Sequence, residues 1–588
     1  MEIKRGRIPE YLVEFFKRNA FNYFFGLFWI ILTDVVQLFI PRMIGNMVDG
    51  LRAKSMSADA LGNKVLFIVL LATLMFISRF LWRIFLVGSS MRVDYYVRET
   101  LFEKFLRLPP KFYDRHKTGD LMARATNDIT AMRMMFGRAL IMAVDASVLT
   151  VIGISIMIRT IDLRLTLVSC IPFPVIAILS VFFGKMIYSR FMAVQEGFSK
   201  LSDATQETFS GIQIVKSYVQ EKGEIEKFTN LSEDYVQKNI RLVKLWGMFF
   251  PLITALSGVS LAISLWYGGT MVIKNQISLG DLIAQTSYVG MLVWPMVSIG
   301  WVVNIIERGL ASLRRINQIL EEEEVPEVKT KEKIVELTGN VKIKDLNFTY
   351  PGAEVKALEN INLNISKGQT IGVIGRTGSG KSTLARLLTR LYKVPDGKIF
   401  IDGHDINKIP YEVLRKDMAM VPQETFLFST TIKENIAYGK SDASMEEIIE
   451  AAKLAKIHDT IMNFPQKYET IVGERGLSLS GGQRQRVTLA RALLMNPKII
   501  ILDDALSAVD ANTEREILEG LKSYMKQRTS IIISHRIIAV KDADLIIVLD
   551  NGRIVEQGTH EELLRNEGVY YKIYKRQTLE EKILSENE

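Results

Sequence analysis

The chain has 588 residues, 48% of them hydrophobic, and carries a formal net charge of +9. Its length exceeds that of one ordinary domain, so two or more structural units are expected. The single cysteine, Cys170, excludes an intramolecular disulfide and a cluster of metal-binding thiolates. The positive charge is compatible with nucleic acid and with basic loops beside a bilayer, and the mean hydropathy of +0.15 is high for a soluble protein.

The N-terminal stretch MEIKRGRIPEYLVEFFKRN is basic and amphipathic and lacks the pattern of a cleavable signal. Six apolar segments follow, each with the roughly 20 residues that a bilayer requires. They cover residues 21–47, 65–87, 136–160, 165–189, 246–273 and 279–306. Buried helices of a large soluble protein are the alternative, but these segments are longer than ordinary core helices. We therefore expect an all-α transmembrane domain of six helices over residues 1–320.

The connections after the second and fourth segments carry far more lysine and arginine than the other connections do. By the positive-inside tendency, both long connections and both termini are predicted to lie in the cytoplasm, in a multi-pass protein of the cell membrane. The stretch 92–108 has helical apolar spacing, so the long connections are predicted to continue the spans as helices. Residues 112–129 and 207–221 are candidates for docking onto whatever lies below the membrane.

The composition changes after Leu320. Residues 321–337 are charged and contain Pro326, which is typical of a linker. From 338 to 578, short β-rich runs alternate with amphipathic helical runs, a pattern that predicts an α/β domain. Residues 579–588 form a charged tail. The six spans argue against a soluble ATPase associated with nucleic acid, which the basic charge alone would allow.

The stretch TIGVIGRTGSGKSTLARLL contains GRTGSGKS, which fits the phosphate-binding pattern G-x-x-x-x-G-K-[ST] at every fixed position. It follows an apolar strand and precedes a helix, so backbone N–H groups can face phosphate oxygens at the positive end of that helix. Lys381 would neutralise the β- and γ-phosphates, and the Ser382 hydroxyl would bind Mg²⁺. The predicted nucleotide contacts are Gly375, Arg376, Thr377, Gly378, Ser379, Gly380, Lys381, Ser382 and the following Thr383.

Four aliphatic residues run into two adjacent acids in IIILDD, Asp503 and Asp504. A hydrophobic strand that ends in an aspartate downstream of a phosphate-binding loop predicts the second acid of a Mg²⁺ site. A helix N-cap is the alternative for a single aspartate. Because the phosphate-binding loop is present, we favour the metal role for Asp503.

The stretch 477–494 contains LSGGQ, Leu479 to Gln483, just upstream of the strand that ends in Asp503. It resembles the signature of the ATP-binding cassette (ABC) superfamily. Six spans followed by one cassette most resemble the half-transporters of the bacterial multidrug and lipid exporter type, and this resemblance covers essentially the whole chain. It implies an α/β P-loop NTPase cassette after the spans and an ATPase coupled to transport, with ATP and Mg²⁺ as cofactors and amphipathic drugs or lipids as cargo.

The resemblance also assigns roles to short motifs. Tyr350 in NFTYPG matches the aromatic residue that stacks on adenine, and Gln423 in VPQE matches the glutamine that contacts Mg²⁺. His535 in IIISHR matches the switch histidine that contacts the γ-phosphate. VGERG, 472–476, matches the segment that contacts coupling helices, and SAVD, ending in Asp510, matches the loop that crosses the dimer interface.

In this family two cassettes enclose two ATP molecules, each between one subunit's phosphate-binding loop and the other's LSGGQ. Small residues and backbone N–H groups at Ser480, Gly481, Gly482 and Gln483 suit close approach to phosphate. The chain has one copy of each motif, so the resemblance implies a dimer.

Family members with full hydrolytic activity usually carry Glu directly after the metal-site Asp, and that Glu polarises the attacking water. This chain has Asp504 instead. Aspartate has similar basicity, but its carboxylate ends about one bond length earlier, and a misplacement of about 1 Å can cost roughly 100-fold in rate. We hypothesise that this chain's own pocket hydrolyses ATP poorly and that a paralogous half-transporter is its partner. The alternative is that Asp504 works through a shifted backbone or an extra water.

The predicted spans contain charged residues, among them Asp34, Arg79, Arg83 and Asp145. Such residues usually face a cavity or a partner. Contact with cargo and a structural role both remain open for Asp34, Arg79 and Asp145, whereas Arg83 is expected to be structural. An ATP-gated channel or a regulatory membrane protein is the alternative function, since a poorly hydrolytic pocket suits slow gating.

Overall fold

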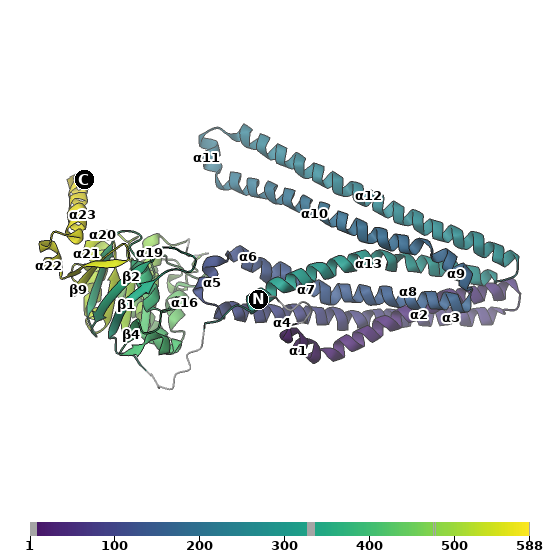
Figure 1. The fold of residues 1–588 in the computed structure, drawn as a ribbon, viewed down its shortest axis with the longest axis horizontal. Helices are drawn as coiled ribbons and strands as arrows, with labels where there is room; N and C mark the ends of the chain where they lie inside the picture. Colours follow the sequence, from purple (N-terminus) through teal and green to yellow (C-terminus); the bar gives the residue numbers. More distant parts are fainter. Residues whose placement is uncertain (1–8, 326–335, 474–475, 477, 587–588) are drawn as a thin grey trace. The chain divides into compact units, whose positions relative to one another are not determined.

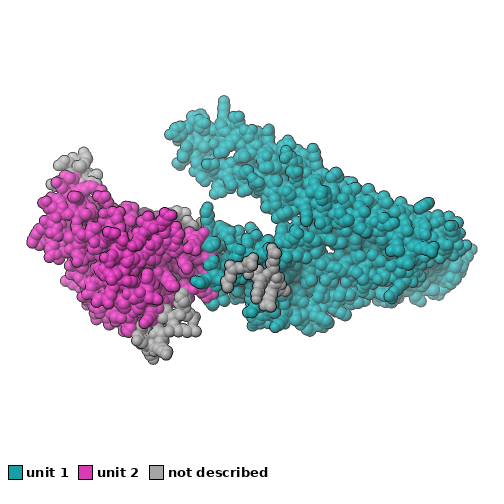
Figure 2. Space-filling view, in the orientation of Figure 1, with its two compact units in different colours: residues 1–107, 116–323 teal, residues 108–115, 324–588 magenta. Residues whose placement is uncertain are grey.

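The computed structural model describes residues 9–325, 336–473, 476 and 478–586. Pro326 of the predicted linker and Glu474 and Arg475 of VGERG lie outside this described part. The chain forms two compact units, which Figure 2 shows in different colours. Residues 1–107 and 116–323 form unit 1, and residues 108–115 and 324–588 form unit 2.

In its described residues, unit 1 is a helical domain without strands (Figure 1). Its helices are α1 (Glu10–Arg18), α2 (Ala20–Arg52), α3 (Ala58–Trp82), α4 (Gly88–Arg107), α6 (Thr118–Ala123), α7 (Ile129–Met134), α8 (Leu140–Thr160), α9 (Leu163–Cys170), α10 (Pro172–Ser210), α11 (Ile212–Ser217), α12 (Glu221–Ile273) and α13 (Leu279–Leu320). Across the described residues these helices make six runs that are long and apolar enough to cross a membrane. The runs extend beyond the apolar segments, as the periodicity of the long connections predicts.

Helices α2 and α13 pack so closely that their backbones touch at Gly45 and Gly280. A Cβ atom on Gly45 would lie 2.4 Å from the Gly280 carbonyl oxygen, so neither position has room for a side chain. The buried Tyr288 hydroxyl donates a 2.7 Å hydrogen bond to the carbonyl oxygen of Leu38, one turn before Pro41. This bond ties a side chain of α13 to the backbone of α2.

Asp34, Arg79, Arg83 and Asp145 have contacts within unit 1. Asp34 is 2% exposed, and its carboxyl interacts with Asp145 on α8 and with Arg79 on α3. The Arg79 guanidinium donates a 2.9 Å hydrogen bond to Gln37. The Arg83 guanidinium lies 5.4 Å from the ring centre of its neighbour Trp82. The structural role of Arg83 remains a prediction, while the other three residues form one polar contact between α2, α3 and α8.

Unit 2 combines two sheets with short helices. Its helices are α5 (Pro110–Arg115), α14 (Lys381–Leu388), α15 (Tyr411–Asp417), α16 (Ile432–Ile436), α17 (Met445–Leu454), α18 (His458–Met462), α19 (Gly481–Leu494), α20 (Ala511–Met525), α21 (Ile537–Val540), α22 (His560–Arg565) and α23 (Val569–Glu586). Its strands are β1 (Val341–Phe348), β2 (Leu358–Ile365), β3 (Thr370–Gly375), β4 (Ile399–Ile401), β5 (His404–Asp405), β6 (Met418–Val421), β7 (Ile499–Asp503), β8 (Thr529–Ile533), β9 (Leu545–Asp550) and β10 (Arg553–Gly558). Residues 579–586 of the predicted tail continue α23.

The larger sheet has the strand order β10-β9-β3-β8-β7-β6, and all neighbours except β10 and β9 run parallel. Strands β7 and β8 are buried throughout, because both faces of a parallel sheet are covered. The register pairs Val373 with Ile533 and Ile533 with Asp503. The loops that follow β3, β8 and β7 therefore leave the same edge of the sheet side by side, which is where ligands bind in such folds.

One segment of the first half of the sequence belongs to unit 2. Within that unit, the Tyr392 hydroxyl donates a 2.6 Å hydrogen bond to Asp114 on α5. Phe112 on the same helix is buried. This segment overlaps the beginning of residues 112–129, for which we predict docking.

Candidate nucleotide-binding site

The loop between β3 and α14 has the backbone conformation that its glycines allow. Gly378 and Gly380 have φ angles of +82° and +99°, a region that other residues rarely adopt. A Cβ atom on Gly380 would also lie 2.5 Å from the carbonyl oxygen of Ala357. The loop leads into α14, whose first N–H groups lack partners within the helix and form a site for anions.

Lys381 is held inside this loop. Its side chain is buried, and Nζ donates hydrogen bonds to the carbonyl oxygens of Gly375 at 2.9 Å and Arg376 at 2.8 Å. Burial lowers the pKa of Lys381, and the nearby carboxylates of Asp504 and Asp503 oppose that change. The buried Ser379 hydroxyl has no hydrogen-bond partner among the described residues. The loop therefore holds a cation and an unused hydroxyl, and both suit phosphate.

Asp503 ends strand β7 beside the loop. The Ser382 hydroxyl donates a 3.1 Å hydrogen bond to Asp503 Oδ1. Burial raises the pKa of Asp503, and the bond from Ser382 opposes that rise. A hydroxyl and a carboxylate placed together are oxygen donors of the kind that Mg²⁺ prefers, so these residues fit that ion. The N-cap alternative does not apply, because the next described helix, α20, is capped by Asp510.

Asp504 has a left-handed backbone with a φ of +49°. Its N–H donates a 2.8 Å hydrogen bond to the carbonyl oxygen of Ile533 on the neighbouring strand. Its carboxylate Oδ2 accepts a 3.2 Å hydrogen bond from Gln423 Nε2. The residue is thus tied to the sheet through its backbone and to the loop after β6 through its side chain, so the reach of its carboxylate depends on side-chain length.

His535 follows β8, the strand that lies between β3 and β7 in the sheet. It therefore lies between the phosphate-binding loop after β3 and Asp503 at the end of β7. Burial and the positive charge of Lys381 lower the pKa of His535, while Asp504 and the carbonyl group of Gly375 oppose that change. A lowered pKa keeps the imidazole neutral at pH 7, so that one ring nitrogen donates and the other accepts.

Tyr350 lies beside the start of α14. Its ring packs edge-on against Phe348 and Tyr392, with centroid distances of 5.1 and 5.2 Å. Its hydroxyl donates a 3.1 Å hydrogen bond to the Thr383 hydroxyl. The structure therefore brings Tyr350 together with the predicted loop residue Thr383.

The LSGGQ segment begins α19. Ser480 and Gln483 cap this helix reciprocally: Ser480 Oγ accepts from the Gln483 N–H at 3.3 Å, and Gln483 Oε1 accepts from the Ser480 N–H at 2.9 Å. A Cβ atom on Gly482 would lie 2.9 Å from the carbonyl oxygen of Ala508. Gln485 bonds both Ser507 and the N–H of Ala508. LSGGQ and SAVD therefore form one packed unit, and among the described residues no hydrogen bond joins LSGGQ to the phosphate-binding loop of the same chain.

Asp510 caps α20 through a 2.9 Å hydrogen bond from the Thr513 N–H. This bond lowers the pKa of Asp510. The contact gives Asp510 a structural role within the chain, and its predicted place at a dimer interface remains a prediction.

Two contacts near His535 have no signal in the sequence patterns. The Arg536 side chain makes an ion pair with Glu514 on α20, and Glu514 is 2% exposed. Gln577 on α23 bonds the backbone on both sides of Arg536. Both partners are far from His535 in the sequence, and neither belongs to a motif. Only a comparison of related sequences would point to these two contacts.

Arg536→Ala is expected to destabilise unit 2 by about 3–5 kcal/mol at pH 8, because it leaves the Glu514 carboxylate buried without its cation. Burial raises the pKa of Glu514, so the protonated carboxyl is favoured by folding and the penalty grows as the pH rises. The loss should therefore be smaller at pH 5.5, and calorimetric unfolding at the two pH values measures it. The exposed pair Arg565 and Glu561 supplies the control, Arg565→Ala, with little effect. An equal loss at both pH values would contradict the expectation.

The fold and the site together define a helical, membrane-length domain joined to an α/β nucleotide-binding domain. Residues 23–296 match the family model described as "ABC transporter transmembrane region", and residues 358–507 match the model described as "ABC transporter". The chain belongs to the ABC transporters, as its motifs predict.

Similar proteins support the same assignment over nearly the whole chain. The multidrug resistance-like ATP-binding protein MdlA of Escherichia coli (strain K12) is 38% identical, covering 96% of both chains. An ATP-dependent lipid A-core flippase of Syntrophus aciditrophicus (strain SB) is 36% identical, covering 84% of this chain and 82% of that protein. The structure of a bacterial Atm1-family ABC exporter with ATP bound has a TM-score of 0.79 and 27% identity, covering 96% and 98%. The predicted fold, the half-transporter assignment and a transport-coupled, ATP-binding ATPase are confirmed.

Proposed function

We propose that this chain is one half of a dimeric exporter that uses ATP to drive amphipathic molecules, drugs or lipids, out across the cytoplasmic membrane. The observation that carries the proposal is that a chain of exporter architecture has one phosphate-binding loop and one LSGGQ. No hydrogen bond among the described residues joins these two motifs, so we infer that each complete pocket needs a second subunit. The names of the relatives, which include a multidrug resistance-like protein and a lipid flippase, support the cargo class.

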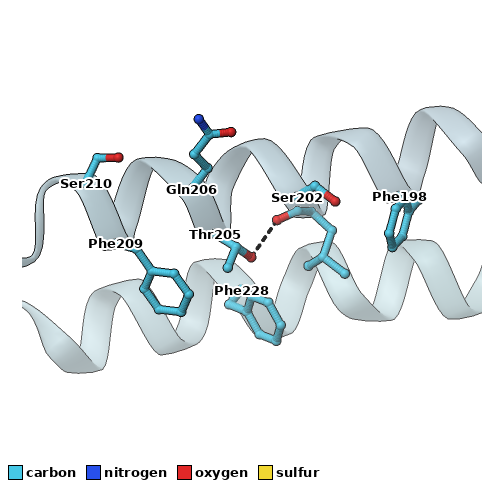
Figure 3. A pocket seen from close by; sticks show the side chains of 8 residues that line it. Phe198, Ser202, Thr205, Gln206, Phe209, Ser210 and Phe228 are labelled. Atoms are coloured by element: carbon cyan, nitrogen blue, oxygen red, sulfur yellow. Dashed lines mark hydrogen bonds between the residues drawn. The ribbon is translucent and has the colours of Figure 1, made fainter. Parts of the chain in front are cut away.

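The hairpin of α10, α11 and α12 supports a dimer. Its distal part diverges from the other helices of unit 1 (Figure 1). Large apolar side chains are exposed there, and they are Phe198, Phe209, Ile212, Ile214, Tyr218, Val219, Ile225 and Phe228. Figure 3 shows Phe198, Phe209 and Phe228 lining a groove between α10 and α12. A cluster of exposed apolar side chains outside the membrane marks a contact with another protein. We propose that the cassette of the partner subunit covers this cluster.

Within the pocket, Lys381 would exchange its carbonyl partners for phosphate oxygens, and Tyr350 would stack on adenine. Ser382, Asp503 and Gln423 would hold Mg²⁺, which neutralises charge on the β- and γ-phosphates when it is bound. His535 would contact the γ-phosphate, while Ser480, Gly481 and Gly482 of each chain would contact the nucleotide of the other. Asp510 would cross the interface beside them.

The carboxylate of Asp504 would stop short of the attacking water, so the pocket built on this chain's own loop would bind ATP and hydrolyse it slowly. The intact LSGGQ would complete a faster pocket on a partner that carries Glu. A heterodimer with a paralogous half-transporter follows. The cassette and both termini would lie in the cytoplasm, and closure of the cassettes would drive alternating access in the spans.

Copurification of the tagged chain from its native host tests the heterodimer. A second cassette chain with Glu after its metal-site Asp is expected in the complex, whereas recovery of the chain paired only with itself would contradict it. In sealed vesicles with the cassettes outside, ATP should drive accumulation of an amphipathic dye against its gradient. Flux that only dissipates a gradient would favour the gated channel instead.

A further inference from the structure

The loop that carries His535 is held by one side chain of the C-terminal helix. Gln577 on α23 donates from Nε2 to the His535 carbonyl oxygen at 2.6 Å. The same amide accepts at Oε1 from the Ile537 N–H at 2.9 Å. A primary amide carries a donor and an acceptor, and this one uses both on the peptide groups that flank Arg536. The backbone on either side of Arg536 is thereby clamped to α23.

In the described part of the chain, no other backbone hydrogen bond is made by the His535 carbonyl oxygen or the Ile537 N–H. Ile537 is the first residue of α21, and the first N–H groups of a helix have no intrahelical acceptor. Arg536 occupies the N-cap position of α21, and its side chain makes no capping bond. Gln577 therefore supplies, from a distant part of the chain, the cap that the local sequence lacks.

The rest of the loop is tied to neighbouring elements. The Ser534 N–H donates a 3.1 Å hydrogen bond to the Val373 carbonyl oxygen on β3, and the Arg536 N–H donates to Ser534 Oγ at 3.0 Å. These bonds hold the N–H groups on either side of His535, whereas the carbonyl group of His535 depends on Gln577. Because the His535 imidazole faces Lys381 and the carbonyl group of Gly375, a rotation of this peptide would displace the imidazole relative to the phosphate-binding loop.

We propose that Gln577 is a positioning residue for ATP hydrolysis: it fixes the backbone of His535 so that the imidazole meets the γ-phosphate. This inference rests on the role proposed for His535. It makes the C-terminal helix part of the machinery that aligns the pocket.

The first test reads the clamp directly, without activity. Hydrogen exchange is measured on the full chain in lipid nanodiscs, before and after Gln577→Ala. The Ile537 amide should exchange about threefold to tenfold faster in the variant, as expected for the loss of one hydrogen bond. Lys575→Ala, an exposed position on the same helix, should leave this amide unchanged. Unchanged exchange in Gln577→Ala would overturn the proposal.

The second test reads ATP turnover in the Asp504→Glu background and in the unmodified chain. Gln577→Ala should lower kcat by about tenfold, with the KM for ATP within about twofold, because a shift of about 1 Å misaligns a reacting group without removing the binding contacts. Gln577→Glu keeps only the acceptor and should fall between wild type and Gln577→Ala.

Two further outcomes separate the claims. If His535→Ala lowers turnover and Gln577→Ala leaves it unchanged, the positioning inference is wrong and the role of His535 stands. If His535→Ala itself leaves turnover unchanged, the role proposed for His535 fails, and the inference fails with it.

Discussion

Asp504→Glu is expected to raise the ATP turnover of the chain paired with itself by about 100-fold, because an added methylene restores roughly one bond length of reach toward the water. The backbone of Asp504 is fixed by its bond to Ile533, and its carboxylate is held by Gln423. These two contacts leave the Asp504 carboxylate little freedom to move closer to the attacking water. Steady-state phosphate release from the purified chain in nanodiscs measures the change.

The matched control is Asp504→Asn, which keeps the size of the side chain and removes the base. It should leave the low turnover of the unmodified chain nearly unchanged, because the proposed defect already limits that pocket. Rapid turnover by the unmodified, self-paired chain would contradict both the slow pocket and the need for a different partner. The φ of +49° at this position is tolerated by Asp better than by Glu, so the variant should also unfold at a slightly lower temperature.

Lys381→Ala is expected to raise the Kd for ATP by at least about 100-fold. Two hydrogen bonds from the ammonium group to phosphate contribute about 1.5–3 kcal/mol each, and about 1.4 kcal/mol corresponds to a factor of ten. Equilibrium binding of a fluorescent ATP analogue to the chain in nanodiscs measures the loss.

Folding stability gives a second reading of the same variant. Burial lowers the pKa of Lys381, so the folded state disfavours its charged form. Removing the ammonium group relieves that cost but also removes its two hydrogen bonds to carbonyl oxygens, so the unfolding temperature should fall only slightly. The control is Lys367→Ala, an exposed lysine of the same unit, with unchanged affinity. Retained ATP affinity in Lys381→Ala would contradict the role of the loop.

Features that depend on neighbouring residues could be predicted from the sequence alone. The spacing of GRTGSGKS predicts a glycine-rich loop that curls around phosphate, and Gly378 and Gly380 have the positive φ angles that glycine allows. The apolar run before Asp503 predicts a buried strand, and β7 is buried throughout. The six apolar segments predict six membrane-length helices, which the described residues contain. In each case the signal and the structure span the same short stretch, since hydrophobic length, periodicity and backbone sterics act locally.

The remaining features were decided only by the tertiary structure. The contact of Gly45 with Gly280, the ion pair of Arg536 with Glu514 and the clamp of Gln577 on His535 join residues from different elements. Periodicity shows which face of a helix is apolar, but it does not show which other element covers that face or which polar group meets a free N–H. Those choices come from the packing of the whole unit, in which strand order and helix contacts bring distant residues within hydrogen-bond distance.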